Sequence, residues 1–348
     1  MRAYATPITD LNRLERQQSF HIGEPSEVAA ARRAGATIAQ QLGFDDVRAG
    51  EVALVITEAA TNIIKHATEG EILLRSVECG ECVGIEIIAL DRGPGISNLQ
   101  LQMQDGHSTT GTYGVGLGTM GRMTDELDIY SHHTCGTAIY MMMWSTQKPP
   151  ANPDWQIGAV CIPIAGEIVC GDDWSLQLNQ NTLVLLVADG LGHGPDAAKA
   201  SNAAVSAIDN HTDESPTRMM QRAHDASRGT RGTAAGIAKI EVDKQQLTYV
   251  GVGNIAMSIF SQGANQHLLS HNGIVGSNMR KMQEFTHSWE PGALLVAHSD
   301  GIGTRWDLGA YPGLIHSHPA LIATILYRDF TRGRDDSTVV VLRSMVRD

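Results

Sequence analysis

The sequence predicts a two-domain protein of the α/β (α+β) class, with helices on a mixed sheet in the first half and mainly strands in the second. The chain has 348 residues, which suits two domains of roughly 150 to 200 residues each. Pro149, Pro150 and Pro153 exclude helix and interior strand at one point of the chain. Candidate strands become more frequent after this point. We therefore expect domains over residues 1–147 and 155–348, joined by a proline-rich linker over 148–154.

Composition narrows the class of protein. Hydrophobic residues make up 42% of the chain and charged residues 18%, as in globular proteins. The formal charge of -12, without clusters of Lys and Arg, argues against a nucleic-acid partner and leaves acidic side chains to bind cations. No apolar run approaches the roughly 20 residues that cross a bilayer, and the first residues lack the apolar core of a secretion signal. We expect a cytoplasmic protein that does not bind membranes.

The five cysteines favour reduced thiols over a disulfide framework, because their number is odd and they are spread along the chain. Cys79-Gly80-Glu81-Cys82 has the spacing of a redox or zinc motif. No second Cys/His pair follows at a suitable distance, and Gly80 favours a turn. We interpret this segment as a β-hairpin turn.

Hydrophobic periodicity assigns the elements in order. In the first half we expect helices over 25–42, 51–66 and 116–124, and strands over 71–75, 83–90, 127–131 and 137–144. In the second half we expect strands over 157–164, 183–188, 234–242, 247–252, 256–260, 294–298 and 337–342, and helices over 195–209, 216–227 and 319–330.

Glu58 and Asn62 lie four residues apart on the helix predicted over 51–66, away from its apolar stripe. Side chains at this spacing have Cβ atoms about 5–6 Å apart. A Glu can accept the proton of an attacking hydroxyl, and an Asn oxygen can bind Mg²⁺ beside the phosphates. Two polar residues one turn apart are more often a solvated helix face, so this pair needs support from other motifs.

Two glycine-rich segments give that support. Asp91-Arg92-Gly93-Pro94-Gly95 directly follows an apolar strand, where a carboxylate can accept a hydrogen bond from an amine such as that of adenine. Gly111-Thr112-Tyr113-Gly114-Val115-Gly116-Leu117-Gly118 precedes a predicted helix, so its backbone N–H groups can meet phosphates. Each segment alone is a weak signal.

In this order, the Glu58/Asn62 pair, both glycine segments and Gly136-Thr137 resemble the ATP site of the GHKL ATPase/kinase superfamily. Segments 62–65, 101–106 and 116–126 look more narrowly like the RsbT switch kinases and their anti-sigma-factor relatives, over roughly residues 24–144. The resemblance implies a GHKL (Bergerat) α/β sandwich that uses ATP and Mg²⁺ to phosphorylate Ser or Thr of a STAS-domain protein. It implies Glu58 as catalytic base, Asn62 as Mg²⁺ ligand and Asp91 as adenine contact. The remaining implied nucleotide contacts are Gly93, Gly95, Gly114, Gly116, Gly118 and Thr137.

The chain departs from the anti-sigma-factor branch at one place. Members of that branch often carry Arg just before the second glycine loop, whereas Thr112 and Tyr113 stand here, which argues against direct sigma-factor binding. A sensor histidine kinase shares the ATP fold but needs a phosphoacceptor His on a long upstream helix. His21 lies beside Gly23 and Pro25, so we discount that alternative.

The second half has acidic residues at strand ends or in turns, at four places: Asp172, Asp189, Asp300 and Asp335-Asp336. An Asp that closes a strand is common, but four such places in one domain are harder to dismiss. Mg²⁺ and Mn²⁺ prefer carboxylates, carbonyls and water, and two such ions about 3.5–4 Å apart can activate a water that attacks a phosphoester.

Three of these segments resemble, in the right order, PPM/PP2C phosphatases of the SpoIIE and RsbX type: Asp189-Gly190-Leu191-Gly192-His193-Gly194, Ser299-Asp300-Gly301 and Asp335-Asp336-Ser337-Thr338. The resemblance covers about 156–342 and implies a β-sandwich flanked by helices that hydrolyses phosphoserine or phosphothreonine with two Mn²⁺ or Mg²⁺ ions. It implies Asp172, Asp189, Asp300 and Asp335 as ligands, of which Asp189 and Asp300 are catalytic. The Gly190 carbonyl is implied as a further metal ligand. Asp336 is expected to lie beside the metal site and to support these ligands. For His193 we prefer a structural or substrate-edge role over general acid.

Together these expectations describe a partner-switching regulator with opposed kinase and phosphatase activities on STAS-domain proteins, in a sigma-factor, stress-response or stressosome-like pathway. Such a chain could also form a homodimer, as kinases of this family often do. One alternative treats the first half as an ATP-gated binding module without kinase chemistry. Another treats the second half as an inactive phosphatase scaffold, which the full set of aspartates disfavours.

Overall fold

The computed structural model describes residues 17–79, 81–96, 116–133, 135–146, 155–179, 181–261, 263–279 and 282–345. Residue contacts divide them into two compact units. The first contains the described residues up to 146 together with Asp307–Ile325, and the second contains the described residues from 155 to Trp306 and from Leu326 onward. The predicted linker over 148–154 lies outside the described residues.

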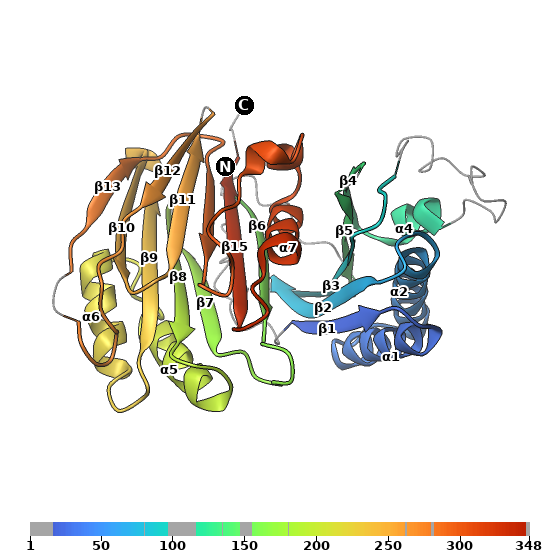
Figure 1. The fold of residues 1–348 in the computed structure, drawn as a ribbon, viewed down its shortest axis with the longest axis horizontal. Helices are drawn as coiled ribbons and strands as arrows, with labels where there is room; N and C mark the ends of the chain where they lie inside the picture. Colours follow the sequence, from blue (N-terminus) through green and yellow to red (C-terminus); the bar gives the residue numbers. More distant parts are fainter. Residues whose placement is uncertain are drawn as a thin grey trace. The chain divides into compact units, whose positions relative to one another are not determined.

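The first unit is built on a five-stranded antiparallel sheet in the order β1-β2-β3-β5-β4 (Figure 1). Strand β5 is buried along its whole length, whereas the edge strands β1 and β4 are partly exposed. The strands are β1 (Gln18–Ile22), β2 (Gly70–Cys79), β3 (Cys82–Asp91), β4 (Glu126–His132) and β5 (Gly136–Trp144).

Helices α1 (Pro25–Gln41) and α2 (Asp46–His66) pack through apolar side chains onto alternate residues of this sheet, and α4 (Gly116–Met123) joins the same core. Helix α1 begins where the Glu27 carboxylate accepts hydrogen bonds from the N–H groups of Gly23 and Glu24, at 2.6 and 2.9 Å. Helix α2 begins at Asp45, whose side chain accepts from the Arg48 N–H at 2.7 Å. Local hydrogen bonding therefore fixes the start of both helices.

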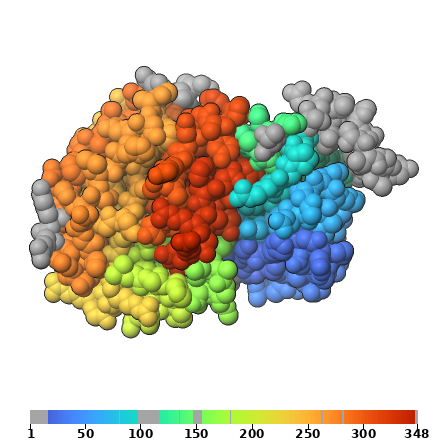
Figure 2. Space-filling model, viewed as in Figure 1, coloured from blue at the N-terminus to red at the C-terminus, as the bar shows by residue number. Residues whose placement is uncertain are grey.

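The second unit is a β-sandwich (Figure 1). Its two five-stranded sheets have the orders β13-β10-β9-β8-β7 and β12-β11-β14-β15-β6, and a single apolar cluster fills the space between them. In the space-filling view the yellow and orange segments, which follow each other in the sequence, form one continuous surface (Figure 2). The strands are β6 (Trp155–Ile162), β7 (Asp172–Asn179), β8 (Thr182–Gly190), β9 (Thr233–Glu241), β10 (Gln246–Val252), β11 (Ala256–Ser261), β12 (Ala264–Leu268), β13 (Phe285–Ser288), β14 (Leu294–His298) and β15 (Ser337–Ser344).

Helices α5 (Pro195–Ser206) and α6 (Pro216–Ala226) cover the outer face of the first of these sheets through a second apolar cluster. Helix α7 (Pro319–Phe330) follows two short 3-10 helices, Leu308–Ala310 and Leu314–His316, and a third 3-10 turn lies at Val242–Lys244. Within the described ranges, no helix is long and apolar enough to cross a membrane.

The α/β fold class and the β-sandwich predicted from the sequence are confirmed. The sheet of the first unit was predicted to be mixed, but all of its described strand pairs are antiparallel. The hairpin predicted at the Cys79–Cys82 segment is also confirmed, since these two residues are the last cross-strand pair of β2 and β3. Helix α2 starts at Asp46 rather than at residue 51, and four strands were not predicted: β1, β7, β12 and β13.

Candidate active sites

The predicted base and Mg²⁺ ligand of the first unit lie next to the start of helix α4. Glu58 and Asn62 are half-buried on α2. A Cβ atom added to Gly116 would lie 3.2 Å from Glu58 Oε2 and 3.4 Å from Asn62 Nδ2. The structure thus brings a carboxylate, a carboxamide and the first residue of a helix together, with little room for a side chain between them.

The predicted adenine contact is fixed by backbone donors. Asp91 Oδ1 accepts hydrogen bonds from the Gly93 N–H at 2.7 Å and from the Thr137 N–H at 3.2 Å. Gly95 has a φ of 75°, and a Cβ there would lie 2.5 Å from the His132 carbonyl oxygen, so only glycine suits this position. Asp91, Gly93 and Thr137, three of the predicted nucleotide contacts, therefore form one cluster.

Two further predicted nucleotide contacts fall in the second glycine segment. Gly118 is buried on α4. Gly114 lies outside the described residues.

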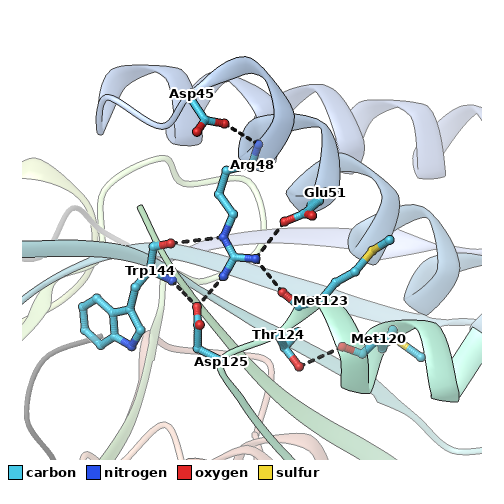
Figure 3. A network of polar contacts seen from close by, with 8 residues as sticks. All are labelled: Asp45, Arg48, Glu51, Met120, Met123, Thr124, Asp125 and Trp144. Carbon is cyan, nitrogen blue, oxygen red and sulfur yellow. Dashed lines mark hydrogen bonds and ion pairs between the residues drawn. The ribbon is translucent and has the colours of Figure 1, made fainter. Parts of the chain in front are cut away.

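A polar network not predicted from the sequence holds the other end of α4 (Figure 3). Arg48 Nη1 donates to the Met123 carbonyl and pairs with Glu51, both at 2.8 Å. Its Nε donates to the Trp144 carbonyl at 3.2 Å, and its Nη2 pairs with Asp125. Asp125 also accepts from the Trp144 N–H at 2.7 Å. One guanidinium thus ties α2, which carries Glu58, to the end of α4 and to β5.

In the second unit, the predicted metal ligands meet where several strands begin or end. Asp172 is the first residue of β7 and is the cross-strand partner of Asp189 in β8. The Asp189 carboxylate accepts a hydrogen bond from the backbone N–H of Asp300, which follows β14. Asp335 lies two residues before β15, and its carboxylate interacts electrostatically with that of Asp300. The fold therefore gathers all four predicted carboxylates, from both sheets of the sandwich.

Burial raises the pKa values of three of these carboxylates. It raises the pKa of Asp189 to about 9, and the neighbouring charges of Asp172, Asp300 and Asp335 add to the effect. It raises the pKa of Asp172 to about 7, against hydrogen bonds from Ser299 and Thr338 that lower it. The pKa of Asp335 is also raised, again mainly by burial. Negative charges held this close without a cation repel one another.

Asp336 has a different position from these four. Its two carboxylate oxygens accept from the Ile164 and Gly171 N–H groups, both at 2.8 Å, and the residue is 1% exposed. This carboxylate fixes the loop that leads into β7, which agrees with the supporting role expected for it.

Several side chains around the aspartates had no assigned role in the sequence analysis. The Thr233 hydroxyl donates to the Asp189 carbonyl at 2.7 Å, and Asn254 Nδ2 donates to Asp300 Oδ2. Ser299 and Thr338 hydrogen-bond the Asp172 carboxylate. Ser299 and Thr338 lie within segments that resemble phosphatase motifs, but pattern alone does not show which atom each one binds.

Gly190 is the last residue of β8, and His193 lies on the loop that follows it. A Cβ at Gly190 would lie 2.1 Å from the Ala197 carbonyl oxygen, so the backbone at this predicted carbonyl ligand packs directly on α5. His193 Nδ1 lies 2.7 Å from Glu167 Oε1, a contact not predicted from the sequence. The imidazole is 56% exposed, as a residue at the edge of a substrate site would be.

The donor set suits hard divalent cations. Asp172 Oδ2 is buried and has no hydrogen-bond partner, a costly arrangement unless something else binds it. The raised pKa values of Asp172 and Asp189 mean that their charged forms are unfavourable unless a positive charge lies nearby. Within the described residues, no three Asp, Glu, His or Cys side chains are already arranged as a closed metal site. The oxygen-rich set fits Mg²⁺ or Mn²⁺ once the carboxylates close around the ion.

Comparisons with known proteins show which family each unit resembles. Residues 23–143 match the family model described as "Histidine kinase-like ATPase domain", and residues 179–344 match that of "Stage II sporulation protein E (SpoIIE)". The two units thus define a protein that combines a GHKL-type ATPase domain with a phosphatase domain of the PP2C class.

Two curated relatives from Bacillus subtilis (strain 168) specify this further. The serine/threonine-protein kinase RsbT is 37% identical over 118 residues, which are 34% of this chain and 89% of RsbT. The phosphoserine phosphatase RsbX is 30% identical over 138 residues, which are 39% of this chain and 69% of RsbX. A solved structure of RsbX in complex with magnesium aligns with a TM-score of 0.51 at 26% identity, over 57% of this chain and 98% of that one. The chain therefore belongs to the RsbT family through its first part and to the RsbX family through its second.

Proposed function

We propose that this protein is a bifunctional partner-switching regulator. The first unit phosphorylates Ser or Thr on a STAS-domain protein with ATP, and the second hydrolyses phosphoserine or phosphothreonine on such a partner. The observation that carries the proposal is the joining, in one chain, of a relative of the kinase RsbT and a relative of the phosphatase RsbX, each with its expected polar residues gathered in space.

For the kinase reaction, Glu58 acts as the base that accepts the proton of the substrate hydroxyl. Asn62 holds the Mg²⁺ that accompanies ATP, and Asp91 accepts from the adenine amine. The hydrogen bonds from Gly93 and Thr137 hold the Asp91 carboxylate in place before the nucleotide arrives. The start of α4 at Gly116 supplies backbone N–H groups to the phosphates.

For the phosphatase reaction, Asp172, Asp189, Asp300, Asp335 and the Gly190 carbonyl hold two Mg²⁺ or Mn²⁺ ions. When bound, these ions supply an activated water and neutralise the phosphate charge. Asn254 orients the Asp300 carboxylate, and Thr233 holds the backbone of Asp189. His193, oriented by Glu167, faces the substrate edge.

The experiment measures phosphate transfer to and from a STAS-domain protein encoded near this one, by intact mass. We expect Glu58→Gln to abolish phosphorylation and Asp189→Asn to abolish its removal, each sparing the other reaction. The exposed residues Glu69 and Asp225 provide matched controls, Glu69→Gln and Asp225→Asn, which keep both activities.

The ATP-gated binding module is the second candidate, and the same experiment separates the two. The wild-type protein would then bind ATP and the partner without transferring phosphate, and the Glu58→Gln variant would behave identically. This result would support gated binding and rule out kinase chemistry.

A further inference from the structure

Two cysteines lie beside the predicted metal ligands, and the reactions proposed above do not use them. Cys161 is in β6, and Cys170 is in the loop before β7. Their Sγ atoms are 3.5 Å apart, and both residues are thiols. A disulfide bond is about 2.05 Å long. The two sulfur atoms are thus in contact and not bonded.

Both thiols are linked to Asp172, Cys161 through hydrogen bonds and Cys170 through the chain. Cys161 Sγ lies 3.9 Å from the Asp172 carbonyl oxygen, and the Thr338 hydroxyl donates to the same sulfur at 3.3 Å. Thr338 also hydrogen-bonds the Asp172 carboxylate. Cys170 is two residues before Asp172 in the chain. A change at either sulfur therefore reaches a predicted metal ligand through one or two contacts.

We propose that Cys161 and Cys170 form an oxidation site, at which a hydroperoxide converts the two thiols into a disulfide that switches off the phosphatase. The inference rests on the proposed phosphatase function for its consequence and on the sulfur geometry for its chemistry. With hydrogen peroxide, the Cys161 sulfur attacks one peroxide oxygen, which gives a sulfenic acid and one water. The Cys170 sulfur then displaces the hydroxyl, which forms the S–S bond and a second water. The two thiols lose two electrons and two protons, and the peroxide is reduced.

The surroundings of the two residues assign these roles. Cys161 is half-buried, whereas Cys170 is only 3% exposed, so a small oxidant meets Cys161 first. The Cys170 sulfur lies 3.5 Å from the Cys161 sulfur, so it is within reach of a sulfenic acid that forms there.

The loop before β7 is held by hydrogen bonds, so it cannot move by itself when the disulfide bond forms. The sulfur atoms must approach by about 1.5 Å to reach bonding distance. Gly171 follows Cys170 directly, and its N–H donates to Asp336 Oδ2 at 2.8 Å while its carbonyl accepts from the Gly190 N–H at 3.2 Å. A Cβ at Gly171 would lie 2.6 Å from Asp336 Oδ2. Displacement of Cys170 is thus passed to Asp172 and Gly190, two predicted metal ligands.

The test uses the full chain with Cys79→Ser, Cys82→Ser and Cys135→Ser, which leaves only the pair in question. The metal-free protein is treated with hydrogen peroxide, the excess is removed with catalase, and Mg²⁺ is added before the phosphatase assay. We expect a mass loss of about 2 Da, from two hydrogen atoms, and a peptide that links Cys161 to Cys170. Phosphatase activity should fall at least tenfold and return with dithiothreitol, and the kinase reaction should not change.

Adding Cys170→Ser or Cys161→Ser to this background removes the mass loss and the reversible inactivation, and the use of two variants guards against one that folds poorly. A linked peptide with unchanged activity would overturn the switch, and sulfinic acid in place of a linked peptide would overturn the oxidation site itself. If the reduced protein has no phosphatase activity, the proposed function is refuted. The oxidation site is still tested in that case, because the linked peptide is measured independently of activity.

Discussion

Asp172 and Asp189 face each other as cross-strand partners of β7 and β8, and both carboxylates are more than nine-tenths buried. Like charges directly opposite each other destabilise a sheet. At the metal site proposed above, a cation would offset this repulsion, and in its absence a proton neutralises one of the charges.

The metal-free protein should lose stability as pH rises. The pKa values of Asp172 and Asp189, about 7 and about 9, lie above the usual 3.8, so the folded state keeps protons that the unfolded chain releases. Stability then falls from about pH 4 to about pH 9 as the folded state must give them up. Thermal unfolding in chelator, from about pH 6 to about pH 9, measures this.

Asp189→Asn removes the larger of these contributions. We expect a shallower pH dependence and, near pH 9, a gain of at least about 1 kcal/mol in metal-free stability, together with lost stabilisation by Mg²⁺. Asp225→Asn, on an exposed face of α6, should keep the wild-type slope. Equal slopes in wild type and Asp189→Asn would show that this carboxylate is charged in the metal-free protein.

Thr233→Val should weaken the phosphatase unit. The hydroxyl is fully buried and donates at 2.7 Å to the Asp189 carbonyl, and valine keeps the shape but not the donor. We expect a loss of about 1–3 kcal/mol in urea unfolding, because the carbonyl becomes unsatisfied. Thr233→Ser retains the hydroxyl and should recover most of it. If the valine variant is as stable as the serine variant, this hydrogen bond does not stabilise the phosphatase unit.

Arg48→Ala should destabilise the ATPase unit. It leaves the Met123 and Trp144 carbonyls without this donor and the Asp125 carboxylate without this cation. We expect about 1–3 kcal/mol less stability and weaker ATP binding, since α4 begins at Gly116 beside Glu58. Arg32→Ala, on the exposed face of α1, serves as the control in unfolding and calorimetry. Indistinguishable losses in the two variants would contradict the assigned role.

Two glycines in adjacent helices should respond in opposite ways to alanine. A Cβ at Gly35 would lie 2.1 Å from the Cδ1 atom of fully buried Ile56, so overpacking should cost Gly35→Ala about 1–2 kcal/mol. Gly50 has no atom within 4 Å of its Cβ position, so Gly50→Ala should gain about 0.5–1 kcal/mol from helix propensity. Denaturation midpoints of the two variants test the close packing of α1 on α2.

Sequence patterns predicted the buried elements better than the edges. The four strands that were missed, β1, β7, β12 and β13, are all edge strands of their sheets. An edge strand has one neighbour and often carries polar residues, so its hydrophobic alternation is weak. Residues Ala264–Leu268 illustrate this, since four of the five are exposed. Asp172 opens one of these strands, and its pairing with Asp189 was therefore not predicted.

The candidate sites show a similar division. Motif order was enough to nominate Glu58, Asn62, Asp91 and the aspartates, because each lies in or beside a short segment whose order along the chain resembles that of known families. Residues that support the surrounding structure, such as Arg48 and Glu167, act through contacts between distant segments. Arg48 and Asp125 are 77 positions apart, and no local pattern links them. Their roles follow only from the fold.

The origin of the aspartates in two different sheets has a consequence for the rest of the domain. Asp172 and Asp189 belong to one sheet of the sandwich, and Asp300 and Asp335 flank strands of the other. The distance between the two pairs is therefore set by the apolar layer that separates the sheets. If the aspartates bind the proposed cations, a cavity opened deep in that layer should weaken cation binding before the domain unfolds.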